Sequence, residues 1–387
     1  MKAIKLTENV YWVGGIDWNL RNFHGYLTQR GSTYNAYLII DEKITLIDTV
    51  KYYLCDEMLE RISSVIDPSK INYIISNHTE MDHSGSIPMI KEIAKNAVII
   101  TSPNGEKGLK LHFKKDWEFK VVKSGDTLNI GSRNLHFYLT PMIHWPDNMV
   151  TYSDKDKILF SNDAFGQHLA SSERFVKELS IDLVLSEGKK YYANIVLPYS
   201  SQVQKILPNL EKLEFKFIAP SHGVIWTEEN IKIILEEYKK WSENKTENRA
   251  LIIYDTMWGS TEKIAYALIQ AFDEKNIFAK LYNLQKIHIS DIMTDLMSAK
   301  YICVGSPTLN NNILPTVSAF LTYLKGLAPI NRIGLAFGSY GWGGQSINIV
   351  NEILKSMNFK MLEPIKIQYI PTKEDLVKIC DDIIRQI

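Results

Sequence analysis

Two different patterns of apolar residues divide the chain. Before about residue 160, short apolar runs separated by polar turns predict strands, and residues 34–40 and 44–48 read as a hairpin. Helical spacing of apolar residues follows near residues 54–66 and 86–95, and strands return around 118–160. This order fits an αββα sandwich, in which helices cover two packed sheets.

From residue 250 onward, apolar strands alternate regularly with helices. The run Ala250–Tyr254 is apolar throughout, as in a parallel strand that is buried on both faces. Apolar residues then fall at helical spacing between Ile264 and Phe272. The second half is therefore predicted to be a doubly wound parallel sheet, and the whole chain to be of the α/β class.

The length of the chain also favours two domains. A single core rarely grows beyond about 250–300 residues, and the chain has 387. The polar run 241–249 follows a helical pattern over 231–238 and has the composition of a surface linker. We therefore expect one domain over residues 1–248 and a second over residues 249–387.

Charge and cysteine usage exclude several classes of protein. Lys plus Arg and Asp plus Glu number 44 each, so no polyanion partner such as nucleic acid is indicated. The sequence has no apolar signal region and no stretch that approaches a membrane span. The three cysteines are scattered and form no Cys-x-x-Cys pair, which excludes iron–sulfur and rubredoxin-type sites and favours the reducing cytoplasm.

The segment Asn77–His83 places four potential metal ligands within six residues: His78, Glu80, Asp82 and His83. It directly follows the apolar run 71–76, so the ligands stand at the carboxyl end of a predicted strand, where α/β sheets place their chemistry. In an extended segment His78, Glu80 and Asp82 share one face. A loop must fold at His83 to bring the fourth side chain to the same side.

Three further potential ligands also follow apolar or strand-like stretches: His144, Asp163 and His222. A lone His or Asp is more often a satisfied polar group than a ligand, but seven in this context indicate a metal site. Carboxylates are hard oxygen donors and suit iron or manganese better than a histidine-rich set of the zinc type. The carboxylate of Glu80 therefore favours iron or manganese over zinc.

Three loops of the second half follow predicted strands, at the face where a doubly wound sheet binds its ligand. The first is rich in hydroxyls and opens a helix, so backbone N–H groups and the helix dipole make an anion site there. It contains no Lys and no Gly-x-Gly-x-x-Gly, which argues against triphosphate and dinucleotide sites. The candidate binding residues are Thr256, Met257, Trp258, Gly259, Ser260 and Thr261, then Pro307, Thr308, Leu309, Asn310 and Asn311, then Ser339, Tyr340, Gly341, Trp342 and Gly343. Glycines allow a planar ring to approach the backbone, and Trp342 and Trp258 are candidates to stack on it.

These motifs resemble a known family. The order HxExDH, His, Asp, His resembles the metallo-β-lactamase fold, whose hydrolases usually show HxHxDH, and the Glu in second place resembles its flavodiiron branch. The loop 256–261 resembles the phosphate loop of flavodoxins, which holds FMN. The resemblance covers the whole chain, because flavodiiron proteins join these two halves in this order.

The resemblance implies specific roles. His78, Glu80 and His144 would hold one iron, Asp82, His83 and His222 the other, and Asp163 would bridge them. His24 would approach the iron pocket as a hydrogen-bond donor, together with Tyr191 or its neighbour Tyr192, of which we favour Tyr191. Asp48 resembles the aspartate that supports the metal loop, although a carboxylate that caps a turn fits it equally well.

The implied function is reduction of dioxygen to water, of nitric oxide to nitrous oxide, or both, by a cytoplasmic oxidoreductase with two irons and one FMN per chain. Electrons would come from rubredoxin or from reduced coenzyme F420. A head-to-tail homodimer, or a dimer of dimers, would be the assembly. The alternatives are a dinuclear zinc hydrolase with an accessory flavin domain, and a flavodoxin-like electron shuttle whose first domain is only structural.

Overall fold

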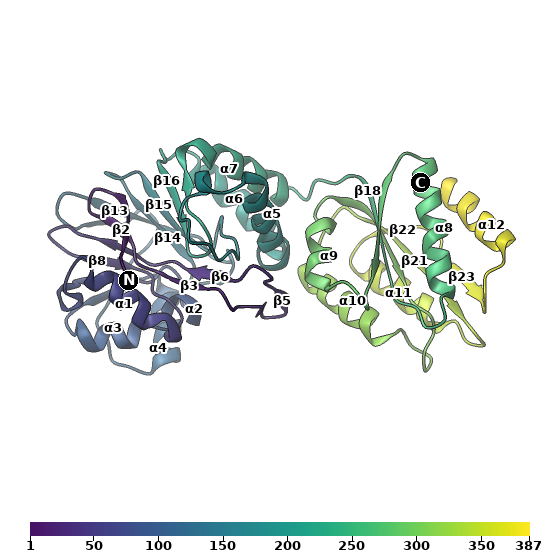
Figure 1. Cartoon of the computed structure of the whole chain (residues 1–387), viewed down its shortest axis with the longest axis horizontal. Helices are drawn as coiled ribbons and strands as arrows, with labels where there is room; N and C mark the ends of the chain where they lie inside the picture. The colour runs from purple at the N-terminus through teal and green to yellow at the C-terminus, as the bar shows by residue number, and fades with distance from the viewer. The chain divides into compact units, whose positions relative to one another are not determined.

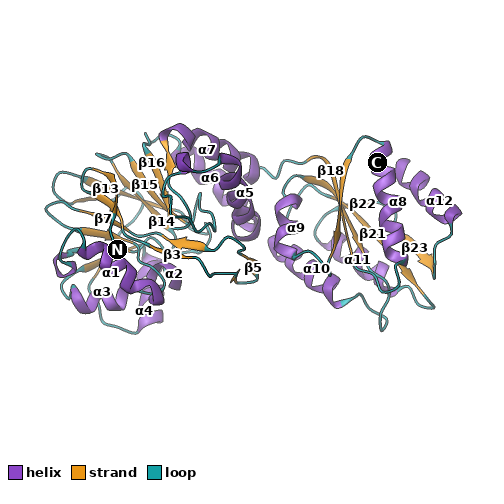
Figure 2. Cartoon of the chain, in the orientation of Figure 1, coloured by secondary structure: helices purple, strands orange, loops and turns teal.

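The computed structural model describes all 387 residues, and the chain divides into two compact units. Unit 1 comprises Met1–Tyr191 and Ser201–Lys239, and unit 2 comprises Tyr192–Ser200 and Lys240–Ile387. Figures 1 and 2 show the elements of each unit. No helix of the chain combines the length and the apolar character needed to span a membrane.

Unit 1 contains two sheets, of seven and six strands, and two small two-stranded sheets. Its strands are β1 (Ile4–Thr7), β2 (Val10–Trp12), β3 (Gly15–Asp17), β4 (Asn22–Phe23), β5 (Tyr26–Leu27), β6 (Ser32–Tyr34), β7 (Tyr37–Ile39), β8 (Thr45–Ile47), β9 (Tyr73–Ile75), β10 (Val98–Thr101), β11 (Phe119–Val121), β12 (Thr127–Asn129), β13 (Asn134–Leu139), β14 (Met149–Ser153), β15 (Ile158–Asn162), β16 (Phe217–Pro220) and β17 (Trp226–Thr227). The larger sheet has the order β1-β2-β7-β8-β9-β10-β11, and the other runs from β12 to β17 in chain order.

The helices of unit 1 cover the outer faces of the two sheets. They are α1 (Cys55–Ser63), α2 (Met81–Ser84), α3 (Ile87–Ile93), α4 (Pro103–Phe113), α5 (Ile181–Tyr191), α6 (Ser200–Leu210) and α7 (Glu228–Ser242). In Figure 1, α1, α3 and α4 lie on one side of the strands and α5, α6 and α7 on the other.

The core of unit 1 explains this layering. Alternate residues of one strand face opposite sides of a sheet. In β7, Leu38 faces the core under α1 and α3, whereas Tyr37 and Ile39 face the core between the sheets. The second sheet contributes Phe137 and Phe160 to the same inter-sheet core. The predicted αββα sandwich is thereby confirmed.

Unit 2 is built on one parallel sheet. Its strands are β18 (Glu247–Tyr254), β19 (Phe278–Asn283), β20 (Ala299–Gly305), β21 (Ile333–Tyr340), β22 (Lys360–Met361) and β23 (Ile365–Gln368), and its helices are α8 (Ser260–Glu274), α9 (Ile289–Leu296), α10 (Pro315–Leu327), α11 (Gln345–Ser356) and α12 (Lys373–Ile384). The order β19-β18-β20-β21-β22 corresponds to 2-1-3-4-5, which is the doubly wound order of flavodoxins. Helices α8 and α12 pack together over one face of the sheet.

The connection between the units differs from the expected surface linker. Trp241, Ser242 and Asn244 are buried. Arg332 Nη1 donates to the Asn244 carbonyl oxygen at 3.3 Å, so the connecting segment is held within unit 2. The expected boundary between residues 248 and 249 therefore lies inside β18, and unit 2 begins earlier, at Lys240. Within this run Lys245, Glu247 and Asn248 are exposed, as the polar composition suggests, whereas Asn244 is buried.

Candidate functional site

The segment Asn77–His83 leaves β9 and is fixed by hydrogen bonds from several elements. Asp48, after β8, accepts from the Asn77 backbone N at 2.8 Å and from its Nδ2 at 3.0 Å. Thr151 of β14 donates to Asn77 Oδ1 at 2.8 Å. The segment does not stay extended, because α2 begins at Met81 and turns His83 inward. This short helix is the fold at His83 that the sequence required.

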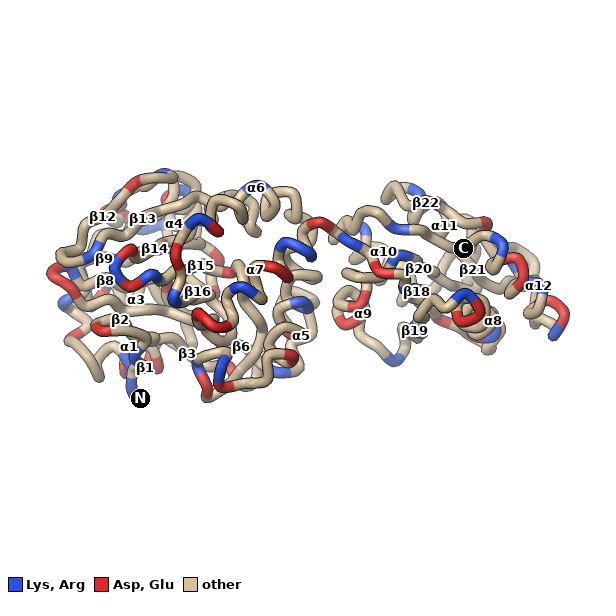
Figure 3. The backbone as a smooth tube through the Cα atoms, turned by 90° about the horizontal axis from the view of Figure 1, so that it is seen from above, with Lys and Arg blue, Asp and Glu red and all other residues tan.

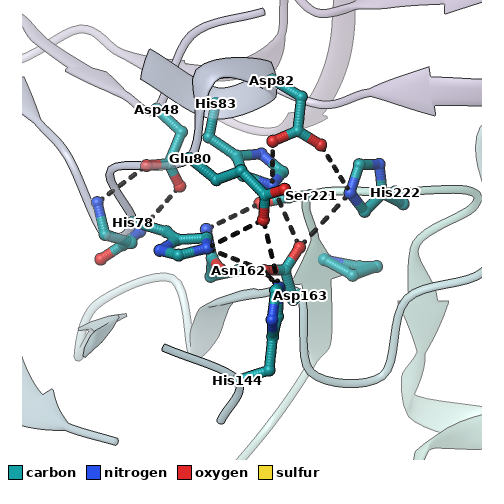
Figure 4. A network of polar contacts seen from close by, with 12 residues as sticks. Asp48, His78, Glu80, Asp82, His83, His144, Asn162, Asp163, Ser221 and His222 are labelled. Atoms are coloured by element: carbon teal, nitrogen blue, oxygen red, sulfur yellow. Dashed lines mark hydrogen bonds and ion pairs between the residues drawn. The ribbon is translucent and has the colours of Figure 1, made fainter. Parts of the chain in front are cut away.

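The seven candidate ligands converge at one point of unit 1 (Figure 4). They come from the segment after β9, from α2, from the ends of β15 and β16 and from the connection between β13 and β14. Their ligand atoms form two groups, each with all atoms within 4.8 Å of one another: His78, Glu80, His144 and Asp163 in the first, and Asp82, His83 and His222 in the second.

Asp163 lies between the two groups. Its Oδ2 is 3.3 Å from His144 Nε2 and 3.6 Å from His78 Nε2. Its Oδ1 is 3.1 Å from His83 Nε2 and 3.3 Å from His222 Nε2. One carboxylate oxygen therefore faces each group, which is the geometry that a bridging ligand requires.

Several buried atoms of this site have no hydrogen-bond partner in the protein. They are both carboxylate oxygens of Asp82 and of Asp163 and both ring nitrogens of His83. Buried polar atoms in folded proteins nearly always have a partner, and a buried carboxylate without one is costly. A pair of metal ions would satisfy these atoms, so the residues present fit a dinuclear metal centre.

Outer hydrogen bonds orient two of the imidazoles. His78 Nδ1 donates to Asp147 Oδ2 at 2.8 Å, and Asp147 also accepts from the backbone N of Thr79 at 2.7 Å. His222 Nδ1 donates to the Thr33 carbonyl oxygen at 2.8 Å. Both rings therefore present Nε2 to the centre, as metal-binding histidines commonly do. The sequence did not indicate the role of Asp147, since nothing local marks it as the partner of a distant histidine.

The electrostatics of the site favour cations. Burial opposes protonation of His144 and His222, but the negative charge of Asp163, whose oxygens lie 3.3 Å from each Nε2, outweighs it, and the pKa rises to about 9 for His144 and about 10 for His222. Burial likewise opposes ionisation of Glu80, yet His144 and His78 hold its pKa well below the usual range. The carboxylates thus create a field that stabilises positive charge at the centre.

The two predicted residues of the iron pocket occupy different environments. His24 is exposed, and its Nε2 donates to Glu80 Oε1 at 3.1 Å. Tyr191 is buried, with its ring centroid 5.8 Å from that of His222. Tyr192 belongs to unit 2, and its hydroxyl lies 3.0 Å from Ser200 Oγ. Of the two tyrosines, Tyr191 is the one beside a ligand.

His168 is a further buried residue of this pocket that the sequence analysis did not identify. Its ring lies 4.8 Å from the His222 ring and 5.1 Å from the Tyr191 ring. Its Nδ1 is 2.7 Å from Ser32 Oγ, and its Nε2 has no hydrogen-bond partner. Burial and the nearby His222 lower the pKa of His168 well below the usual range. It stands outside any recognisable motif, which is why only the fold reveals it.

Unit 2 contains a separate cavity of about 670 Å³ at the carboxyl ends of its strands. Its size is typical of a cofactor pocket. It is lined by Met257, Trp258, Ser260, Pro307, Thr308, Asn310, Asn311, Ser339, Tyr340, Gly341, Trp342, Gly343, Tyr369 and Ile370. Thr256, Gly259, Thr261 and Leu309 were also expected to bind but do not line it, whereas Tyr369 and Ile370, after β23, were not expected.

The residues around this cavity fit a phosphorylated, planar cofactor. Gly259 adopts a φ of +81° at the N-cap of α8, a conformation that glycine accommodates readily. Thr261 Oγ1 lies 3.2 Å from Ser339 Oγ, which joins the first and third loops. Hydroxyls and the positive end of α8 suit a phosphate, and Trp258 and Trp342, each more than nine-tenths exposed, are free to cover a ring.

Comparison with family models divides the chain in the same way. Residues 33–223 match the model described as ODP family beta lactamase, and residues 252–382 match the flavodoxin model.

Relatives match over nearly the whole length of both proteins. The nitric oxide reductase of Moorella thermoacetica is 42% identical, covering 100% of this chain and 98% of that protein. The rubredoxin-oxygen oxidoreductase of Megalodesulfovibrio gigas is 44% identical, covering 97% and 95%. The coenzyme F420H(2) oxidase of Methanothermobacter marburgensis is 38% identical, covering 97% and 95%.

Solved structures agree with these relatives. Rubredoxin oxygen:oxidoreductase of Desulfovibrio gigas superposes with a TM-score of 0.97 at 43% identity, covering 99% of this chain and 97% of that one. The flavodiiron protein of Giardia intestinalis gives a TM-score of 0.96 at 34% identity, covering 100% and 96%.

Proposed function

This chain belongs to the flavodiiron protein family, and we propose that it reduces dioxygen to water, nitric oxide to nitrous oxide, or both. Its cofactors are FMN in unit 2 and two irons in unit 1. The observation that carries this proposal is the position of Asp163 between two groups of buried ligand atoms, one of which contains Glu80. A carboxylate-rich dinuclear site beside a flavin domain suits redox chemistry better than hydrolysis.

When bound, the irons supply single-electron steps and open positions for the gas, and FMN supplies a store of two electrons. The protein's own side chains hold the site ready for this chemistry. Asp147 and the Thr33 carbonyl oxygen keep His78 and His222 in the tautomer that presents Nε2. His24, which is exposed, donates from Nε2 to Glu80 and so places a polar side chain beside this ligand. Buried Tyr191 packs its ring 5.8 Å from the ring of His222.

The electron donor is proposed from the relatives alone. One is named for rubredoxin and another for coenzyme F420H(2). Either would deliver electrons to the FMN of unit 2. Anaerobic mixing of the oxidised protein with reduced rubredoxin or with reduced F420 would separate the two, since only the true donor should bleach the flavin at a catalytic rate.

We further propose a head-to-tail homodimer as the smallest active assembly. Two exposed apolar side chains, Met81 and Trp145, directly adjoin metal ligands in the sequence. Others surround the flavin cavity, including Trp258 and Trp342. Large exposed apolar patches usually mark contact surfaces. In a two-fold dimer the flavin cavity of each chain would lie against the metal site of the other chain. Both exposed surfaces would then be covered in both chains.

A subunit-mixing experiment tests this assembly. One inactive variant carries Asp163→Ala, and the other carries Ser260→Ala with Thr261→Ala to abolish FMN binding. After reversible dissociation and reassociation, a mixed dimer contains one interface with an intact flavin and an intact metal site. Activity should then partly return. If electrons pass within each chain, the mixture stays as inactive as its components.

The dinuclear zinc hydrolase is not favoured, because the relatives with named activities are oxidoreductases. Metal analysis of anaerobically prepared protein should find close to two irons per chain. Stoichiometric zinc together with full gas-reducing activity would contradict the proposal. The hypothesis of a flavodoxin-like electron shuttle, whose first domain is only structural, does not explain why seven potential ligands converge in unit 1.

The cellular compartment also remains a proposal. All three cysteines are free and buried, which fits a reducing compartment such as the cytoplasm. Basic and acidic residues are interspersed along both units (Figure 3), which gives no support for a polyanion partner. The partners we propose are a small gas, an electron donor and a second copy of the chain.

A further inference from the structure

Asp255 is a buried carboxylate at the carboxyl end of β18, directly before the first flavin loop. No Lys, Arg or His forms a salt bridge with it. Its side chain neither lines the cavity nor reaches the metal site. A buried charge without a cation must be stabilised by hydrogen bonds, so the donors around Asp255 indicate what the carboxylate holds in place.

Three parts of unit 2 donate to this carboxylate. Oδ1 accepts from the backbone N of Thr256 at 2.6 Å and from Gln285 Nε2 at 2.6 Å. Oδ2 accepts from the Thr316 hydroxyl, in the first turn of α10. Gln285, after β19, also donates to the Thr256 carbonyl oxygen at 3.3 Å. The backbone of Thr256, the first residue of the flavin loop, is therefore held through both its N–H and its carbonyl oxygen.

The constraint extends along the loop to the helix that follows it. Thr256 Oγ1 accepts from the backbone N of Gly259 at 3.1 Å. Gly259 is the N-cap of α8, and Ser260, the first residue of that helix, lines the cavity. Asp255 thus determines where the backbone N–H groups at the start of α8 point. These groups are the ones suited to a phosphate.

We propose that Asp255 is a positioning residue that preorganises the phosphate loop and so gives the site its preference for a phosphorylated flavin over the same ring without phosphate. This inference rests on the proposed function, because it assumes that the cavity takes FMN. Preorganisation raises affinity by removing the cost of ordering a loop on binding. The benefit should apply only to the part of the ligand that the loop contacts.

Equilibrium binding to the flavin-free full-length protein tests the proposal. Titrations with FMN and with riboflavin, followed by quenching of flavin fluorescence, give the ratio of the two affinities. We expect Asp255→Ala to weaken FMN binding about 10-fold or more, since hydrogen bonds to a charged group are lost. Riboflavin, which lacks the phosphate, should bind as it does to the wild type.

A conservative variant separates position from charge. In Asp255→Asn the amide oxygen still accepts from Thr256 and Gln285, and the amide nitrogen can donate to the Thr316 hydroxyl oxygen. Asn should therefore restore the preference for FMN. A parallel loss of both flavins in Asp255→Ala, or failure of Asn to restore the ratio, would overturn the proposal.

Two glutamine variants provide a matched pair. Gln285→Ala should lower the FMN-to-riboflavin ratio, because it removes one hydrogen bond to Asp255 and one to the Thr256 carbonyl oxygen. Gln270→Ala should leave the ratio unchanged, since Gln270 is an exposed residue of α8 whose side chain donates to Glu274 in the same helix. If Asp255→Ala fails to fold, the ratio of the FMN and riboflavin affinities measured for Gln285→Ala tests the proposal instead. A wild-type protein that binds neither flavin would refute the proposed function itself, whereas wild-type binding with an unchanged ratio in the variants refutes only the role of Asp255.

Discussion

The metal site of unit 1 and the flavin cavity of unit 2 both lie at the carboxyl ends of strands, but their construction is opposite. The metal ligands are almost fully enclosed, and they include two carboxylates and an imidazole without hydrogen-bond partners. The flavin cavity is bordered by Trp258 and Trp342, which are 92% and 91% exposed. The first site is an interior whose charges require ions, and the second is a surface that a large planar ligand would cover.

This difference predicts how each site responds to damage. Removal of one buried ligand leaves charges that no other residue compensates, so the loss should be nearly complete. Removal of one residue from the flavin cavity takes away part of a large contact area, so the loss should be graded. The variants below test that distinction, beginning with the largest expected effect.

Asp163→Ala should eliminate gas reduction while FMN remains bound and reducible. Loss of an outer partner of a metal ligand typically costs about 10–100-fold, so loss of the residue between both ligand groups should cost more than about 100-fold. Steady-state consumption of oxygen and of nitric oxide measures the effect, and the flavin absorbance provides the control. Loss of FMN from a folded Asp163→Ala protein would contradict the separation of the sites.

Arg133→Ala should destabilise unit 1 without weakening FMN binding. Arg133 is buried, and it donates to Asp156 Oδ2 at 2.7 Å and to Asp41 Oδ2 at 2.8 Å. Removing one partner of a buried ion pair typically costs about 3–5 kcal/mol. Denaturant unfolding should show this loss in the transition of unit 1. Lys110→Ala removes an exposed pair with Glu106 and should change the free energy of unfolding by less than about 1 kcal/mol.

Asp147→Ala should weaken iron binding by about 10–100-fold, because His78 loses the acceptor that orients it. Asp147→Asn should be milder, since its amide oxygen can still accept from His78 and Thr79. Competition with a chelator of known affinity measures the change. Equal iron affinity in Asp147→Ala and the wild type would show that the His78 ring is held without this bond.

Trp342→Ala should weaken FMN binding only a few-fold, since stacking of aromatic rings contributes about 1 kcal/mol beyond the area buried. The measurement is a fluorescence titration of flavin-free protein. Trp18→Ala replaces another exposed tryptophan, in unit 1, and should have no effect on it. Complete loss of FMN binding in Trp342→Ala would contradict the claim that single changes in the flavin cavity weaken binding only in part.

The sequence revealed both sites because each is built at strand ends. Apolar strands are recognisable, and polar residues that follow them mark the edge of a sheet where ligands bind. Strand ends marked His78 and Asp163 as candidate ligands, and the family resemblance implied that they meet, although their positions differ by 85 (163 − 78). It could not identify Asp147, His168 or Tyr369, because their importance comes from neighbours that only folding brings close.

The connecting segment shows a different limit. Polar composition suggested exposure, yet Trp241 and Asn244 are buried. The residues Tyr192–Ser200 also belong to unit 2 although they lie between two helices of unit 1 in the sequence. Composition reports the average preference of a segment for water. It does not report whether a buried guanidinium such as that of Arg332 reaches a backbone carbonyl oxygen of the segment.

The most direct test of the whole account is anaerobic stopped-flow oxidation of the reduced protein by nitric oxide, comparing iron-loaded and zinc-loaded samples that contain equal FMN. We predict rapid reoxidation of the flavin in the iron-loaded protein and a flavin that stays reduced in the zinc-loaded one. An equal rate of flavin reoxidation in both samples would mean that the seven converging ligands do not form the redox centre.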